Sequence, residues 1–383
     1  MNVRPTVLRA ALVAMLTLAA LAYAHSHGLG ARRPPQAEGA PTAPRLTTTV
    51  LSQLYTIDRK YRSMSGPWSQ EKVLLERSER PELLWITGYR AEMVAADGTT
   101  AQPAELMCHS NLDVDVARHL ETMGSDPGFS QRLFTLSQGQ LDVRFPDGFG
   151  IPILSDEALD LTTQVLNLNH EGSALEVRHK VTIEYVRERE LDQPMKALFP
   201  TAAYGLALLA DAEAGEDGAR GGYFGVENPD QQTQGPGCLV GNSASDHSYH
   251  DGMGREFTGH WVVPPGRQVN RTLVTHLMRL PYPTRIHYIA VHLHPFAQSL
   301  ELRDLTTGES LFTSQARNLD DRIGLAKVDA LASAEGIAVY PDHEYELVSV
   351  YDNTSGEPQD SMAVMYLYLR DLAAEKRLPN HRG

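Results

Sequence analysis

Cysteines and basic residues are scarce in this chain, and both shortages narrow the possible functions. Only two of the 383 residues are cysteine, Cys108 and Cys238, and 34 Lys and Arg face 48 Asp and Glu, a formal net charge of −14. An acidic chain without a basic patch is a poor nucleic-acid binder, so we expect no nucleic acid among its partners. The sequence also lacks the motifs G-x-S-x-G, H-E-x-x-H and a Gly-rich phosphate loop. It therefore gives no support for the enzyme classes that these motifs indicate.

The N-terminus lacks a hydrophobic run long enough to cross a membrane. Its apolar stretch, Ala10–Ala24, has 15 residues, whereas a spanning helix needs about 20. Two arginines precede the stretch and an Ala-Tyr-Ala cleavage site ends it, so residues 1–24 are predicted to be a signal peptide. We therefore expect a secreted or periplasmic protein with no membrane span after cleavage.

Helical periodicity is weak along most of the chain. Short alternating apolar runs, separated by Gly, Pro and Asp turns, predict strands instead. The expected fold is all-β, with two antiparallel, jelly-roll-like β-sandwich domains joined by an irregular segment. The predicted divisions are a signal peptide at 1–24, a flexible leader at 25–45, an N-terminal sandwich at 46–186, an insertion or linker at 187–257, a C-terminal sandwich at 258–372 and a polar tail at 373–383.

Histidine, in contrast, is plentiful, with 15 residues, and imidazole is a common ligand for copper and zinc. In "VHLHPF", His292 and His294 stand two apart in a predicted strand, which places both rings on one face. Alone, such a pair is explained better by ordinary histidines of a polar face or a hydrogen-bonded core than by a metal site. Met362, at the start of a later strand, offers a third donor. Two imidazoles and a thioether suit copper better than zinc, because soft sulfur favours Cu(I).

An ordered series of motifs around these residues resembles the copper type II, ascorbate-dependent monooxygenases, the family of peptidylglycine α-hydroxylating and dopamine β-monooxygenases. The series covers residues 258–370 and reads "VVPPGRQV", "YP", "HLH", "LELRDLTTGESLF", "YDNT" and "DSMAVMYLY", with 68 residues from His294 to Met362. The resemblance implies that His292, His294 and Met362 hold the copper at which O2 is activated. It further implies that Tyr366 lies beside the substrate, and that ascorbate or a similar small reductant is a co-substrate.

The predicted N-terminal sandwich, residues 46–186, is called the first block below. It matches the family's other copper site, which handles electron transfer, less closely. Cys108-His109 stands where the family has two histidines, and His170 matches its later histidine. Two alternatives stay open. These three residues could hold a second copper, or Cys108 could form a disulfide with Cys238. His179 alternates with apolar residues and is interpreted as a hydrogen-bonded core histidine.

Departures from the family pattern bear on the substrate. Ala290 and Val364 replace an arginine and an asparagine of the peptide-hydroxylating members, and losing the guanidinium removes the main anchor for a carboxylate. The prediction is therefore a copper-dependent monooxygenase that uses O2 to hydroxylate a C–H bond of a small or weakly polar substrate. The rivals are a non-catalytic copper-binding or structural protein on the same scaffold, and a carbohydrate- or partner-binding sandwich with incidental histidines. His247, His250 and His260, in a polar loop, are predicted to be solvated.

Overall fold

Strands make up most of the part of the chain that the computed structural model describes, which is residues 43–77, 79–123, 130–172, 174–208, 224, 248–251 and 255–378. The predicted signal peptide, most of the predicted leader, Cys238 and His247 lie outside these residues. The all-β prediction is confirmed, with several antiparallel sheets as expected for β-sandwiches.

The first block contributes the strands β1 (Leu46–Leu51), β2 (Tyr55–Ile57), β3 (Trp68–Val73), β4 (Leu83–Ala95), β5 (Met107–Val114), β6 (Arg132–Leu136), β7 (Asp142–Arg144), β8 (Phe149–Leu154), β9 (Leu159–Val165) and β10 (Leu175–Arg187). The strands that follow are β11 (Lys196–Tyr204), β12 (Ala207–Leu208), β13 (Ser248–His250), β14 (Glu256–Thr258), β15 (Trp261–Val263), β16 (Gly266–Leu273), β17 (Thr284–Leu293), β18 (Ala297–Asp304), β19 (Glu309–Asn318), β20 (Leu325–Val328), β21 (Leu331–Val339), β22 (Tyr345–Asn353), β23 (Gln359–Ser361) and β24 (Ala363–Arg370). The helices are short: η1 (Ala104–Leu106), α2 (Val116–Met123), η2 (Glu188–Glu190), α3 (Thr275–Met278) and α4 (Leu372–Arg377).

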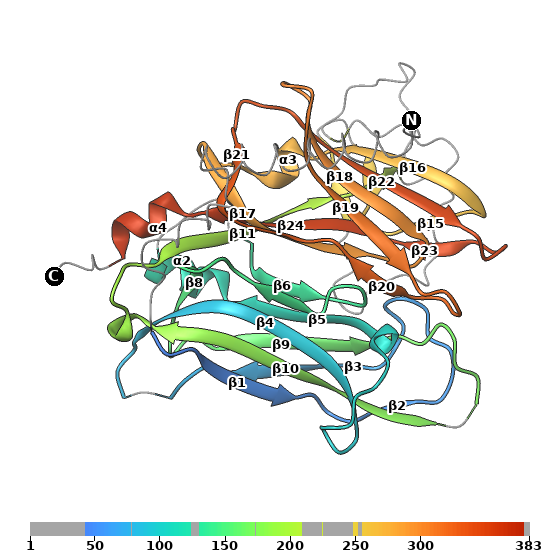
Figure 1. Ribbon diagram of the computed structural model, residues 1–383, viewed down its shortest axis with the longest axis horizontal. Coiled ribbons are helices and arrows are strands. Elements are labelled where there is room, and N and C mark those ends of the chain that lie inside the picture. Colours follow the sequence, from blue (N-terminus) through green and yellow to red (C-terminus); the bar gives the residue numbers. More distant parts are fainter. Residues whose placement is uncertain are drawn as a thin grey trace, which may run out of the picture. The chain divides into compact units, whose positions relative to one another are not determined.

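The strands form layered sheets (Figure 1), and two large hydrophobic cores lie between these sheets. The first packs β4 and β10 against the sheet β3-β9-β5-β6. The second packs β17 and β24 against the sheet β16-β22-β18-β19-β20. In each core the side chains come from alternate positions along the strands, as the period of two requires.

Strand β24 is buried on both faces and belongs to both cores. Val364, Tyr366 and Tyr368 pack into the first core, whereas Met365 and Leu367 pack into the second. A strand covered on both faces has no polar side to alternate with. This explains why "AVMYLYL" reads as one continuous apolar run.

Within the predicted linker at 187–257, the structure has the strand β11. β11 pairs antiparallel with β24 and, through Lys196 and Ala197, parallel with β8. A ten-stranded sheet with the main order β1-β10-β4-β8-β11-β24-β17-β21 therefore runs past the expected boundary at residue 186. The sequence did not indicate this nine-residue strand because Pro200, a residue that is rare inside sheets, lies at its centre. The predicted polar tail also begins differently, since α4 occupies its first residues and is capped by the Asp371 side chain.

Candidate metal centre

His292 and His294 stand side by side at the C-terminal end of β17. Each residue is only 7% exposed, and their ring centroids are 5.3 Å apart with the planes at 83°. Two imidazoles that bind one ion at about 2.0–2.1 Å, near the tetrahedral angle, place their centroids roughly 5 Å apart. The observed spacing fits a shared metal ion.

The turn after His294 ends the strand and fixes the position of the second ring. Phe296 has a φ of 71°, in the left-handed region that residues other than glycine rarely adopt. Its backbone N–H donates to the Asn318 side chain at 2.6 Å, and the Ala297 N–H donates back to the His294 carbonyl at 3.3 Å. Local strain of this kind persists where the surrounding structure holds it, and it often marks functional sites.

Hydrogen bonds at Nδ1 orient both rings. Nδ1 of His294 donates to the Asp360 backbone carbonyl at 3.2 Å, and a carbonyl can only accept, so the proton is on Nδ1. Nδ1 of His292 lies 2.9 Å from the Ser137 hydroxyl, which itself donates to the Gln138 carbonyl at 3.4 Å. That hydroxyl is therefore placed to accept from Nδ1. Metal-binding histidines are commonly held in this way, and the ligating atom is then Nε2.

Burial favours the uncharged form of His294 that a metal ion requires. Desolvation lowers the pKa of His294 below its ordinary value, although the nearby Asp360 opposes this shift. A neutral imidazole protonated on Nδ1 presents its lone pair on Nε2.

The Tyr351 hydroxyl ties His294 to Met362. It accepts from the His294 backbone N–H at 3.3 Å and donates to the Met362 carbonyl at 2.6 Å. The register agrees, because His292 pairs with Val364 in the β17–β24 ladder. One further step of two residues along each strand sets His294 opposite Met362. Met362, the single residue between β23 and β24, is buried in the first core, and its role as a metal ligand stays a prediction.

A hairpin from the first block supports the site from the other side. Gln140 accepts from the Val291 N–H at 2.7 Å through its side-chain oxygen, and Gln138 accepts from the Leu325 N–H at 2.8 Å. Gln140 and Ser137 thus join the first block to β17, and Gln138 joins it to β20. Sequence reasoning missed these supporting residues and Tyr351, because their partners lie far away in the chain.

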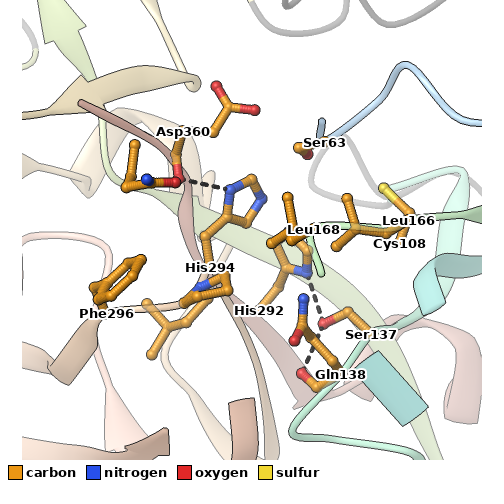
Figure 2. A pocket seen from close by; sticks show the side chains of 13 residues that line it. Ser63, Cys108, Ser137, Gln138, Leu166, Leu168, His292, His294, Phe296 and Asp360 are labelled. Atoms are coloured by element: carbon orange, nitrogen blue, oxygen red, sulfur yellow. Dashed lines mark hydrogen bonds between the residues drawn. The ribbon is translucent and has the colours of Figure 1, made fainter. Parts of the chain in front are cut away.

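The two histidines line one pocket together with residues of the first block (Figure 2). The space between its walls, including the open mouth, is about 420 Å³. It is lined by Ser63, Cys108, Ser137, Gln138, Leu166, Leu168, His292, Leu293, His294, Pro295, Phe296, Gln359 and Asp360. Neither Met362 nor Tyr366 is among these residues, and Tyr366 is instead buried in the first core.

The predicted electron-transfer residues are not gathered in one place. Cys108, a free thiol, faces the histidine pocket, whereas His109 is buried on β5 and His170 is exposed beyond β9. Among the residues that the structure describes, no group of three or more His, Cys, Asp and Glu is arranged to hold a metal ion. A second copper at Cys108, His109 and His170 therefore stays a prediction from the resemblance, without support from this geometry.

Two other histidines differ from expectation. His260 is buried rather than solvated, and its ring centroid lies 6.0 Å from that of His294. The polar sequence around it gave no sign of this packing. His179 is fully buried as predicted, but both ring nitrogens lack a hydrogen-bond partner among the described residues. Burial lowers the pKa of His179 to about 3, so this ring is neutral.

Comparisons with known proteins give no family for the chain. No family model and no curated protein matches the sequence. Among solved structures, the tandem CBM22 domains of Paenibacillus barcinonensis Xyn10C cover 87% of this chain and 94% of their own at 11% identity, with a TM-score of 0.18. A Corynebacterium diphtheriae protein described as membrane anchored covers 86% of this chain and 93% of its own at 10% identity, also with a TM-score of 0.18. Similarity this low supports no functional argument.

Helices in the described part of the chain are all too short or too polar to cross a membrane.

Proposed function

We propose that this protein binds copper through His292, His294 and Met362 and is a copper-dependent monooxygenase. It would hydroxylate a C–H bond of a small, weakly polar substrate with O2 and a small reductant such as ascorbate, in the secreted or periplasmic setting that the N-terminus predicts. The observation that carries the proposal is the buried histidine pair, whose rings are spaced for one ion and held through Nδ1.

The donor set fits copper on chemical grounds. Neutral imidazoles bind both Cu(I) and Cu(II), and a thioether adds preference for Cu(I). Tyr351 holds the backbones of His294 and Met362 together, so the thioether and the second imidazole are positioned as a unit. Bound copper would supply one-electron redox chemistry toward O2, while the protein orients the donors and shapes the pocket.

The pocket also supports the proposed substrate class. No Lys or Arg is among its described lining residues, which include Leu166, Leu168 and Phe296. Ala290, at the position of the peptide hydroxylases' arginine, is buried and carries no charge. A carboxylate would have no cationic partner here. A neutral or weakly polar molecule fits these walls better than a peptide C-terminus.

A non-catalytic copper-binding protein is the second candidate, and one observation favours it. Hydroxylation consumes two electrons per O2, so a single copper needs a second electron source. Cys108, His109 and His170 do not form a metal-binding group in the structure. A protein with only the histidine-pair site could bind copper without turning over.

The test is copper analysis of the full chain after loading under reducing conditions. The proposal expects the His292→Ala, His294→Ala double variant to lose one copper per chain with unchanged circular dichroism. The matched control is His343→Ala, which removes a part-buried histidine bound to Asp304 and should keep the copper. Equal copper in the double variant and the wild type would refute the site.

Catalysis is tested separately, by ascorbate-dependent O2 consumption over a panel of neutral and carboxylated substrates. Faster consumption with neutral compounds supports a monooxygenase. Copper-loaded protein that consumes no O2 with any of them would favour the non-catalytic candidate.

A further inference from the structure

Strand β1 forms one end of the ten-stranded sheet. It pairs with β10 over all six of its residues without a register shift, and among the described residues no strand lies on its other side. Figure 1 shows β1 at the lower margin of the first block, outside β10. An edge strand of this kind presents backbone N–H and C=O groups that can pair with another chain.

The hydrogen bonds to β10 show which backbone groups of β1 face outward. Directly after β1, the Ser52 N–H donates to the His179 carbonyl at 2.9 Å. In an antiparallel ladder, bonded and non-bonded residues alternate, so every second residue counted back from Ser52 bonds to β10. The backbone groups of the residues between them, which are Thr47, Thr49 and Leu51, therefore point away from the sheet. The side chains of these three residues are exposed as well.

The edge at β1 lacks the features that usually prevent strand pairing, such as charge, proline or a bulge. The opposite end of the same sheet has two of them. There, β21 pairs with β17 through a register shift between Ile286 and Tyr288, and it carries the exposed Glu335. In contrast, β1 has the sequence LTTTVL, without a charged residue or a proline. Its neutral and β-branched residues suit pairing with a further strand.

The three outward-facing residues are arranged symmetrically about Thr49. If a second β1 lies antiparallel to the first across a two-fold axis at Thr49, each Thr49 faces the other, and Thr47 of each copy faces Leu51 of its partner. All of these are hydrogen-bonded pairs, so both edges are used and the assembly closes at two copies. In any other antiparallel register, at least one outward-facing residue lies opposite a residue outside β1.

The side chains agree with this register. Cross-strand threonine pairs are favourable, and no like charges meet within β1. Leu51, which is 44% exposed, comes to lie against Thr47 of the second copy. Beyond the strand, Arg45 faces Gln53, whose backbone N–H donates to the Glu71 carboxylate at 3.1 Å. The register therefore brings a guanidinium toward a carboxylate at each end of the contact.

We propose that this protein forms a homodimer in which the β1 strands of two copies pair antiparallel about Thr49. The partner is a second copy of this chain, and the two ten-stranded sheets join into one continuous sheet. None of the described residues that line the histidine pocket belongs to β1. The dimer therefore leaves that pocket accessible, and the proposal is independent of the proposed copper chemistry.

The experiment measures the mass of the full chain by sedimentation equilibrium over a range of protein concentrations. The wild type should change from monomer to dimer as its concentration rises. Thr49→Lys and Thr49→Glu each place like charges on the two-fold axis, so each should weaken association at least tenfold. An equimolar mixture of the two variants should associate again, because opposite charges then meet. The matched control is Ala334→Lys, which adds a charge at an exposed position of the other edge strand, β21, and should dimerise like the wild type.

Hydrogen exchange of the backbone amides tests the register. The amides of Thr47, Thr49 and Leu51 should become protected as the dimer forms. Those of Thr48 and Val50, which already bond to β10, should not change.

Three results would overturn the proposal. The first is a wild type that stays monomeric at every concentration. The second is a dimer that persists unchanged in Thr49→Lys, which would place the contact elsewhere on the surface. The third is a mixture of the two Thr49 variants that associates no better than either variant alone, although both are folded by circular dichroism.

Discussion

Tyr351→Phe tests whether the Tyr351 hydroxyl positions His294 and Met362 together for copper binding. The change removes a single buried hydroxyl, which accepts from the His294 N–H at 3.3 Å and donates to the Met362 carbonyl at 2.6 Å. The ring itself stays and keeps its edge contact with Trp261, whose centroid is 6.2 Å away. The perturbation is therefore limited to these two backbone groups.

The expected cost follows from the burial of those groups. A buried polar group that loses its partner costs roughly 1–3 kcal/mol. The bond to the His294 N–H is long and belongs at the low end of this range, so the total loss of unfolding free energy should be about 2–4 kcal/mol. The donors would also be less firmly placed, and loss of a supporting contact typically weakens metal binding by about tenfold or more.

Urea unfolding and Cu(I) competition measure the two effects separately. Tyr345→Phe is the matched control, because Tyr345 is fully buried on the same strand. Its hydroxyl likewise bridges a backbone N–H and carbonyl, both of Tyr340, at 2.7 and 3.1 Å. The control should lose comparable stability and keep full copper affinity. The reasoning is refuted if Tyr351→Phe keeps wild-type copper affinity, or if both variants lose it equally.

Three further predictions concern the core, the hairpin and the histidine support. Burial lowers the pKa of His179 to about 3. As the pH falls below about 6.5, the unfolded chain takes up a proton at His179 that the folded chain does not. The free energy of unfolding should therefore fall by about 2 kcal/mol between pH 7 and 5. In urea unfolding, His179→Leu should remove this contribution to the pH dependence. Gly139 and Gly308 both have a positive φ, +87° and +77°, but a Cβ at Gly139 would lie 3.1 Å from a neighbouring side-chain carbon, whereas one at Gly308 would meet open space. Gly139→Ala should therefore lower the free energy of unfolding by about 1 kcal/mol more than Gly308→Ala. Ser137→Ala, which removes the Nδ1 partner of His292, should weaken Cu(I) binding about tenfold by chelator competition.

Each of these has a result that would contradict it. An unchanged acid dependence in His179→Leu would show that this ring is not buried neutral. Equal destabilisation by the two glycine variants would show that a Cβ at Gly139 causes no steric clash. Wild-type copper affinity in Ser137→Ala would remove the hydroxyl from the support of the site.

The sequence by itself determined the fold class and the arrangement within single strands. Alternating and continuous apolar runs predict strands, because side chains in a strand repeat every two residues. The same period set His292 and His294 next to each other, and their ring centroids are indeed 5.3 Å apart. Such features depend only on neighbours along the chain, which a pattern in the sequence reports directly.

Only the tertiary structure decided what surrounds the two histidines. The bond from His292 joins it to Ser137, 155 residues earlier, and Tyr351 links His294 to Met362 across separate strands. Cys108 lines the same pocket as the histidines, and β11 pairs with β24 in the ten-stranded sheet. Both features arise from segments that meet only in the folded chain. Strand order, register and burial depend on contacts between distant segments. A periodic pattern carries no information about which segments those will be.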